Sequence, residues 1–227
     1  MNKRIRIFLT VIALLVITDS YAEVADGLDK IMNPSEPAVQ EPCADCPEMV
    51  SIPSLGISIG KYEVTQGQWK AIMGTNPSYF AACGDNCPVE SVSWNDIQAF
   101  LVKLNQRTGQ QYRLPSEKEW EAACRAGEQY EYCGSNTVDE VAWYSDNSGD
   151  STHPVGKKKP NAFGLFDMSG NAFEWVQDCF DSSCTLRVLR GGSWRNGSWF
   201  TRSASRYNRT SGFRDYHDGI GFRFALG

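Results

Sequence analysis

Cysteine offers more chemistry than any other residue type in this sequence, and all eight cysteines lie before residue 185. An even cysteine count indicates disulfides in a chain that leaves the cytoplasm, whereas in a cytosolic chain it indicates metal or redox chemistry. The cysteines fall into close pairs, so we expect local disulfides, with longer links as an open alternative. The expected pairs are Cys43 with Cys46, Cys83 with Cys87, Cys124 with Cys133, and Cys179 with Cys184.

Residues 187–223 combine arginines with aromatic and small polar side chains. Rigid aromatic anchors beside adaptable Ser, Gly and Asn side chains are typical of binding surfaces. We therefore predict a ligand-binding surface here and assign no catalytic residue, with Trp194, Phe222 and Arg223 expected in the scaffold. The candidate contact residues are Arg195, Asn196, Ser198, Trp199, Phe200, Thr201, Tyr207, Asn208, Phe213 and Tyr216.

The first 22 residues have the pattern of a secretory signal, which bears on the redox state of the cysteines. A short basic stretch precedes an apolar run over 7–17, and Ser20 and Ala22 place small residues where signal peptidase cleaves. We expect cleavage after Ala22, a linker over 23–48, and a periplasmic or secreted protein; a retained N-terminal anchor is the alternative. The apolar run is shorter than the ~20 residues of a spanning helix, so no membrane span is expected after cleavage.

The charge balance bears on the class of partner. The full chain has a formal net charge of −5 at pH 7. Nucleic acid and anionic membrane surfaces call for a basic face, so neither is expected as a main partner. Hydrophobic residues make up 41% of the sequence, which is enough for the chain to bury a core of its own.

The elements that must position these residues change in character along the chain. Capping-box spacing marks helix starts at Thr65 and Ser116, and Ser93 opens another helix between them. Gly74 and Gly109 end the first two helices, and a short strand is expected over 60–64. Beyond residue 127, short runs are broken by Gly, Asn, Asp and Ser. This pattern predicts an α+β domain with few helices and much irregular chain.

Several long motifs follow one another over about residues 49–226. They are Glu63-Val64-Thr65, Pro88-Val89, Val92-Ser93-Trp94, Arg113-Leu114-Pro115-Ser116-Glu117, Pro160-Asn161-Ala162-Phe163-Gly164-Leu165, Glu174-Trp175, Arg190-Gly191-Gly192-Ser193-Trp194 and Gly221-Phe222-Arg223. In this order they resemble the formylglycine-generating enzyme, or sulfatase-modifying factor, family. The resemblance implies that residues 49–227 form a variant of the C-type lectin fold, with a small twisted antiparallel sheet.

Members of that family that make formylglycine are similar to one another in a copper-binding cysteine pair just after the Gly-Gly-Ser motif. Soft thiolates suit Cu(I). In this chain the two positions are Asn196 and Thr201, and no cysteine follows Cys184. We therefore expect neither copper binding nor oxidation of a sulfatase cysteine. A formylglycine-generating oxidase is kept as the alternative to a non-catalytic binding domain.

A second enzyme alternative is an accessory oxidase of a small-molecule pathway. The resemblance extends to another oxidative branch of the superfamily, whose members make sulfoxides. They hold iron with three histidines in a separate helical domain. This chain has two histidines, His153 and His217, in polar sequence where we expect both to face solvent.

The resemblance also implies a structural Ca²⁺ site. A hard cation takes oxygen ligands, here two side chains and two backbone carbonyls. The alternative is that the aspartate caps a turn and the glutamate pairs with an arginine such as Arg190. The implied ligands are Asp167, Gly170, Ala172 and Glu174.

Taken together, the sequence predicts an exported, disulfide-stabilised, monomeric binding domain for an unknown protein or small molecule. The segment 187–223 also resembles the variable region of lectin-fold proteins that retroelements diversify, because it ends in Ile220-Gly221-Phe222-Arg223. Ordinary family members end in the same way. A fixed surface and a diversified surface therefore both remain open.

Overall fold

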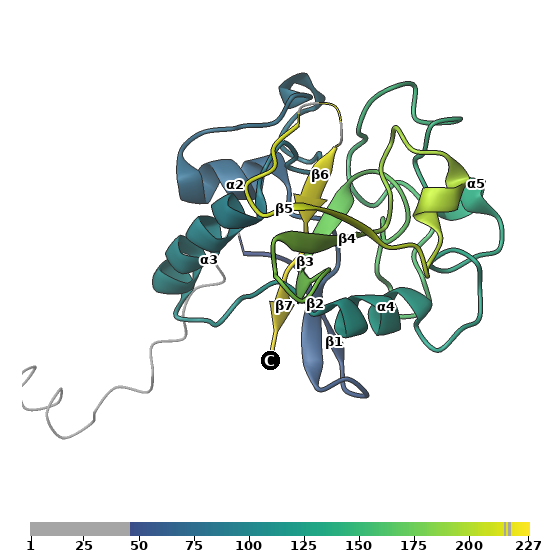
Figure 1. The fold of residues 1–227 in the computed structure, drawn as a ribbon, viewed down its shortest axis with the longest axis horizontal. Coiled ribbons are helices and arrows are strands. Elements are labelled where there is room, and N and C mark those ends of the chain that lie inside the picture. Colours follow the sequence, from purple (N-terminus) through teal and green to yellow (C-terminus); the bar gives the residue numbers. More distant parts are fainter. Residues whose placement is uncertain (1–45, 216, 218) are drawn as a thin grey trace, which may run out of the picture. The chain divides into compact units, whose positions relative to one another are not determined.

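The computed structural model describes residues 46–215, 217 and 219–227 (Figure 1). The predicted signal peptide and most of the predicted linker lie outside the described residues. In the described part, no helix combines the length and apolar character needed to cross a membrane. The fold is a mixed α+β architecture with few helices and small curled sheets, as the sequence predicts.

The three predicted helices are present, and each begins with a capping box. The N-caps are Thr65, Ser93 and Ser116, whose side chains accept from the backbone three residues on. Gly74 and Gly109 end the first two helices in the left-handed conformation, as predicted. The helices are α2 (Gln66–Met73), α3 (Trp94–Thr108), α4 (Glu117–Arg125) and α5 (Val138–Val141), with short 3-10 helices η1 (Ala81–Cys83) and η2 (Ser198–Thr201).

The strands form two small sheets, with orders β1-β2-β7 and β5-β4-β3-β6. Most neighbours are antiparallel, but β3 and β6 pair in parallel, which refines the antiparallel sheet that the sequence predicts. The strands are β1 (Met49–Ile52), β2 (Ile57–Gly60), β3 (Phe173–Cys179), β4 (Leu186–Arg190), β5 (Tyr207–Thr210), β6 (Ile220–Phe222) and β7 (Ala225–Leu226).

The strand predicted over 60–64 is wrong in its position, because β2 ends at Gly60. Beyond this residue, Glu63 turns inward and accepts from the Ala172 N–H at 2.8 Å. The Val64 N–H then donates to the Phe222 carbonyl at 2.8 Å. The chain does not continue as a strand of this sheet, because Glu63 and Val64 form hydrogen bonds with Ala172 and Phe222 instead.

Two hydrophobic clusters lie beneath the helices. In the first, Trp69 of α2 stacks on Phe100 of α3, with 4.9 Å between ring centroids, and the two helices lie side by side (Figure 1). In the second, Trp120, Ala123 and Cys124 of α4 face inward, as predicted. Both clusters include residues of β3 and β4, and the candidate binding segment begins within β4.

Disulfides join three of the predicted cysteine pairs. They are Cys83–Cys87, Cys124–Cys133 and Cys179–Cys184. The predicted pairing of Cys43 with Cys46 falls outside the described residues, since Cys43 is not among them. The three bonds are compatible with an oxidising compartment outside the cytoplasm.

Candidate functional site

The candidate binding segment leaves β4 at a turn of two glycines. Gly191 and Gly192 have positive φ angles of 87° and 74°, a conformation that glycine adopts readily. A Cβ atom on Gly192 would lie 2.8 Å from Cγ2 of Thr201 and 2.9 Å from the Phe200 carbonyl oxygen. The turn therefore lets the chain pack back on itself through η2 before it enters β5.

The two positions of the copper-binding cysteine pair have structural partners of their own. Oδ1 of Asn196 accepts from the Ser193 N–H at 3.1 Å and from the Ser193 hydroxyl at 2.6 Å. The Thr201 hydroxyl donates to the Ser198 carbonyl at 2.8 Å, and the Thr201 side chain is buried. Both side chains hold the loop in shape, and neither carries a soft ligand atom.

A pocket of about 290 Å³ opens within this segment. The sequence predicts four of its lining residues, and the structure adds Phe173 from β3 and Arg209 from β5. Phe173 could not be found from the segment alone, but Arg209 belongs to the same alternation of arginines and aromatic residues. The lining residues are Phe173, Arg195, Asn196, Phe200, Tyr207 and Arg209.

Aromatic rings form one wall of the pocket. The rings of Phe173 and Tyr207 are nearly parallel, with centroids 5.7 Å apart, and Phe200 meets Tyr207 edge-on at 5.9 Å. The Arg209 guanidinium lies 4.5 Å from the Tyr207 ring centroid, within the range of a cation–π contact. The rings thus pack against one another, and the Arg209 guanidinium lies beside them.

A second pocket, of about 390 Å³, lies on the other side of Phe200 and is lined by Trp199, Arg202 and Arg206, among others. Trp199 is 63% exposed, and the Arg202 guanidinium stacks 4.3 Å from its ring. An exposed tryptophan of this kind is typical of an interaction anchor. Trp199 is therefore accessible, as a contact residue must be.

The remaining predicted contact residues have different surroundings. Thr201 is buried, which corrects its assignment to the surface: the close Gly192 turn covers it. Phe213 is half-buried against the first hydrophobic cluster, and Asn208 pairs with Val188 in the sheet. Ser198 is half-buried at the start of η2. Tyr216 lies outside the described residues.

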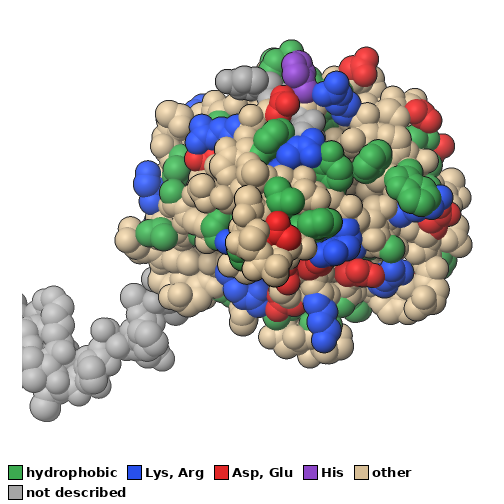
Figure 2. Space-filling view, viewed as in Figure 1, with side chains coloured by type: hydrophobic (Ala, Val, Ile, Leu, Met, Phe, Trp, Pro, Cys, Tyr) green, Lys and Arg blue, Asp and Glu red, His purple; other side chains and the backbone are tan. Residues whose placement is uncertain are grey.

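Hydrophobic and basic side chains are interspersed over the face that carries β4 and β5 (Figure 2). Several arginines of the segment pair with carboxylates from other elements. Arg195 has no carboxylate partner among the described residues, and its Nη1 lies 3.5 Å from the His217 carbonyl. The pairs are Arg190 with Glu117 and Glu121, Arg202 with Glu131, Arg206 with Glu117, and Arg214 with Asp96.

Glu174 of the implied calcium site is buried and has strong partners. It accepts from the Arg223 guanidinium at 2.6 and 2.7 Å and from Nε1 of Trp120 at 2.6 Å. The alternative that Arg190 neutralises Glu174 is therefore wrong in its partner. Arg190 and Glu174 are directly opposite in the β3–β4 pairing, but the Arg190 side chain turns to α4 instead.

Glu174, Asp167 and Glu63 form a group of three buried carboxylates around Arg223. Glu63 is the member that was not predicted from the sequence as part of a site. Burial raises the pKa of Asp167 to about 6. Burial, with the charges of Asp167 and Glu174, raises the pKa of Glu63 well above its usual range. Three carboxylates sharing one guanidinium leave excess negative charge, which a proton or a cation must balance.

The residues of this site fit a hard cation in part. Oδ2 of Asp167 accepts from the Gly156 N–H at 2.7 Å, whereas its buried Oδ1 has no partner among the described residues. In the described part of the chain, no three His, Cys, Asp or Glu side chains are arranged to hold a metal. A cation at Asp167 would therefore depend on the backbone carbonyls of Gly170 and Ala172.

The two histidines differ in exposure. His217 is exposed, as expected. His153 is half-buried and stacks on Trp143, with 3.8 Å between ring centroids, which corrects the expectation that it faces solvent. Its Nε2 lies 2.7 Å from the Ser148 carbonyl, so its position is structural.

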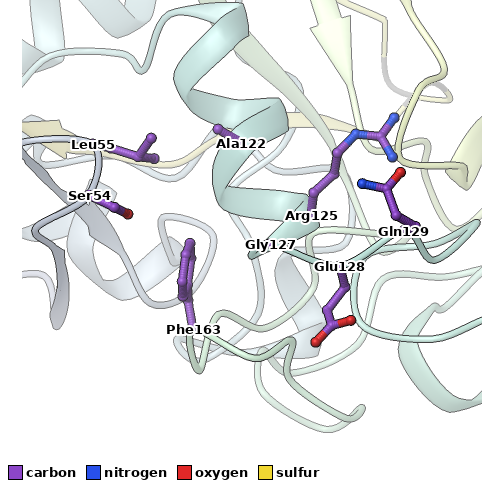
Figure 3. A pocket seen from close by; sticks show the side chains of 8 residues that line it. All are labelled: Ser54, Leu55, Ala122, Arg125, Gly127, Glu128, Gln129 and Phe163. Carbon is purple, nitrogen blue, oxygen red and sulfur yellow. The ribbon is translucent and has the colours of Figure 1, made fainter.

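A third pocket, of about 310 Å³, lies between the β1–β2 turn and α4. Figure 3 shows Ser54 and Leu55 on one side and Arg125, Glu128 and Gln129 on the other. Ala122, Gly127 and Phe163 complete its lining. No sequence pattern indicates this pocket, because its walls come from separate parts of the chain.

A lectin-type α+β domain with this motif order defines the class of the protein, and the comparisons agree. Residues 35–226 match the sulfatase-modifying factor enzyme 1-like domain. The chain therefore belongs to the formylglycine-generating enzyme, or sulfatase-modifying factor, family.

Proteins with different names are similar to this chain. Chaperone protein LppX of Paenibacillus barcinonensis is 34% identical over 194 residues, covering 60% of this chain and 68% of that protein. Inactive C-alpha-formylglycine-generating enzyme 2 of Bos taurus is 31% identical over 157 residues, covering 62% of this chain and 50% of that protein. The solved structure of Treponema denticola variable protein 1 matches with a TM-score of 0.69 and 32% identity, covering 75% of this chain and 84% of that one.

Proposed function

We propose that this protein is an exported, non-catalytic binding domain whose segment 187–223 holds a protein or small-molecule ligand. One observation carries the proposal: the pocket of about 290 Å³ lies beside Asn196, the first of the two positions that hold the copper-binding cysteines in the family's oxidases. Asn196, which replaces the first cysteine, lines that pocket and is held by Ser193. This position therefore has a cavity of a size that can hold a small ligand, but it has no thiolate that could hold an oxidising metal.

The relatives support this proposal by their names. One is called a chaperone and another an inactive enzyme, and both roles are compatible with binding without oxidation. The likeness to a protein named as variable supports the alternative that the binding surface is diversified. If no near-copy of codons 187–223 and no reverse transcriptase gene lies in the surrounding DNA, diversification is excluded.

Site-specific photo-cross-linking tests the binding surface directly. We would place benzoylphenylalanine at Trp199 or Tyr207 in the full chain and irradiate cells of the natural host. Position 102 of α3 is the matched control, because Val102 is 57% exposed and apolar but lies outside the segment. Adducts of defined mass at 199 and 207, and their absence at 102, are expected. Equal labelling at all three positions, or none at any, would contradict the proposal.

The oxidase alternative has its own test. Purified protein is supplied with Cu(I), oxygen and a cysteine-containing peptide, and the peptide is examined for an aldehyde by mass spectrometry. We expect no turnover, because neither Asn196 nor Thr201 offers a thiolate. An aldehyde that forms only with copper present would establish the enzyme.

Export and a monomeric state complete the proposal. The disulfides and the N-terminal pattern support export. Sequencing of the mature N-terminus should find Ala22 removed with the signal. Light scattering of the purified protein should give the mass of one chain.

A further inference from the structure

We propose that the pocket beside Arg195 binds an anionic group carried on an aromatic or otherwise planar body. This inference rests on the proposed binding function and narrows its ligand class. The donors are Arg195 and Asn196, and the aromatic wall consists of Phe173, Phe200 and Tyr207. Carboxylate and phosphate share this chemistry.

The charge around the pocket is the first argument. No acidic residue is among the described residues that line it, whereas two arginines are. Arg195 is exposed, and among the described residues its guanidinium meets a carbonyl oxygen but no carboxylate. Other arginines of the segment already have ion-pair partners, such as Glu131 for Arg202. Arg195 is thus a planar cationic fork with donors to spare, which suits a carboxylate or phosphate.

The orientation of Asn196 is the second argument. Its Oδ1 accepts from the Ser193 N–H, which can only donate, so the orientation of the amide group is determined. No described residue accepts a hydrogen bond from Nδ2 of Asn196. The side chain lines the pocket, so this N–H₂ group is a second donor for an anion held by Arg195.

The rings supply the third argument. Phe173 is buried and packs nearly parallel against Tyr207, so the half-buried rings of Tyr207 and Phe200, which meet edge-on, supply the accessible aromatic surface. Such a wall favours a flat apolar group by stacking or edge contacts. The volume of about 290 Å³ limits the bound part to a small group such as one side chain. A purely inorganic anion would leave this wall without contact.

Calorimetric titration of the full mature protein with three probes tests the proposal. N-acetylphenylalanine carries a carboxylate, N-acetylphenylalaninamide has the same shape without the charge, and phenyl phosphate distinguishes phosphate from carboxylate. We expect at least one anion to bind about tenfold tighter than the amide, with the preference falling as salt rises.

Variants of two arginines locate the effect. Arg195→Gln should remove the preference for the anion, and Arg195→Lys should retain part of it as a point charge. Arg202→Gln is the matched control from the same segment, since Arg202 does not line this pocket and pairs with Glu131. Circular dichroism confirms that each variant is folded.

The outcomes separate this inference from the binding function. Equal binding of all three probes, no saturable binding of any, or a preference unchanged in Arg195→Gln would overturn the anionic ligand class. If cross-links at 199 and 207 persist in that case, the binding surface stands with another ligand class. If the cross-links are also absent, the proposed function fails as well.

Discussion

Arginines of the segment 187–223 lie in two opposite environments. Arg190 and Arg223 are 1% and 0% exposed and reach carboxylates on other elements. Arg195, five residues beyond Arg190, is exposed and has no carboxylate partner in the described part of the chain. The same residue type therefore acts as an internal counter-ion in one place and as an available donor in the other.

The sheet explains the difference. Arg190 ends β4, where its side chain reaches Glu117 and Glu121 of α4, and Arg223 follows β6, where it pairs with the buried Glu174 of the neighbouring β3. Arg195 lies in the loop between the Gly191-Gly192 turn and η2, where the chain runs over the surface. Position in the fold decides what an arginine contributes, although the local composition is similar.

Arg223→Met should give the largest effect on this comparison. It leaves Glu174 buried without its guanidinium, and breaking a buried ion pair costs about 3–5 kcal/mol. Urea unfolding of Arg223→Met and of the surface control Arg202→Met should show a loss of this size only in the first. A loss below about 1 kcal/mol at Arg223 would break the comparison.

A double variant sharpens this result. Arg223→Met combined with Glu174→Gln removes both charges, so its stability should recover part of the loss despite the second substitution. The coupling exists because the guanidinium donates to both Glu174 oxygens. Additive losses in the double variant would contradict the assignment of this pair.

The elements that the sequence predicts well are local ones. Capping boxes and terminal glycines fix α2, α3 and α4, and the short cysteine separations fix three disulfides. The buried carboxylate group could not be predicted in the same way. Glu63 and Ala172 are 109 residues apart in the chain, and only the tertiary fold brings them together.

The candidate site shows the same division. The alternation of arginines and aromatic residues indicates Arg195, Asn196, Phe200 and Tyr207 as pocket residues. It cannot indicate that Thr201 is buried beneath the turn, because that depends on the close approach at Gly192. Phe173 enters the pocket from β3, so it lies outside any pattern of the segment itself.

Calcium should have the next largest effect, through Asp167. Among the described residues this buried aspartate has a side-chain oxygen without a partner, so a bound cation would stabilise the folded state by about 2.7 kcal/mol at a hundredfold excess over Kd. Thermal unfolding at pH 7 should give a higher Tm with Ca²⁺ than with EDTA.

Asp167→Asn should remove that difference, whereas Asp146→Asn, at an exposed position, should keep it. Mg²⁺ is a useful second control because it demands a tighter octahedral site. Identical melting of the unmodified protein with Ca²⁺ and EDTA would show that a proton, and not calcium, balances the buried carboxylates.

The ion pair of Arg113 and Glu119 is partly exposed, so its exposure lies between that of the buried arginines and that of Arg195. It predicts that the free energy of unfolding depends on pH. Hydrogen bonds from Arg113, and from Ser116 at the helix start, lower the pKa of Glu119 from 4.5 to about 2. A lowered folded-state pKa contributes stability above pH 4.5 that is lost as pH falls toward 2. Glu119→Gln should therefore cost about 1 kcal/mol at pH 7, given the partial exposure.

The measurement is the difference in unfolding free energy between the unmodified protein and Glu119→Gln as a function of pH. This difference should shrink as pH falls below about 4.5, because Glu119 of the unfolded chain binds a proton there, whereas the folded protein binds it only near pH 2. Lys118 is exposed next to it without a role in the pair, so Lys118→Gln serves as the charge-change control. A difference that stays constant down to pH 3 would contradict the pairing with Arg113.

Arg195→Gln should have the smallest effect on stability, which is the opposite end of the comparison from Arg223→Met. An exposed arginine without an ion pair contributes little to the folded state, so its free energy of unfolding should change by less than about 0.5 kcal/mol. The same variant should lose the preference for an anionic ligand. Neutrality for folding together with a loss of the anion preference would assign Arg195 to ligand binding, whereas a loss above about 1 kcal/mol would place it with the internal arginines of the scaffold.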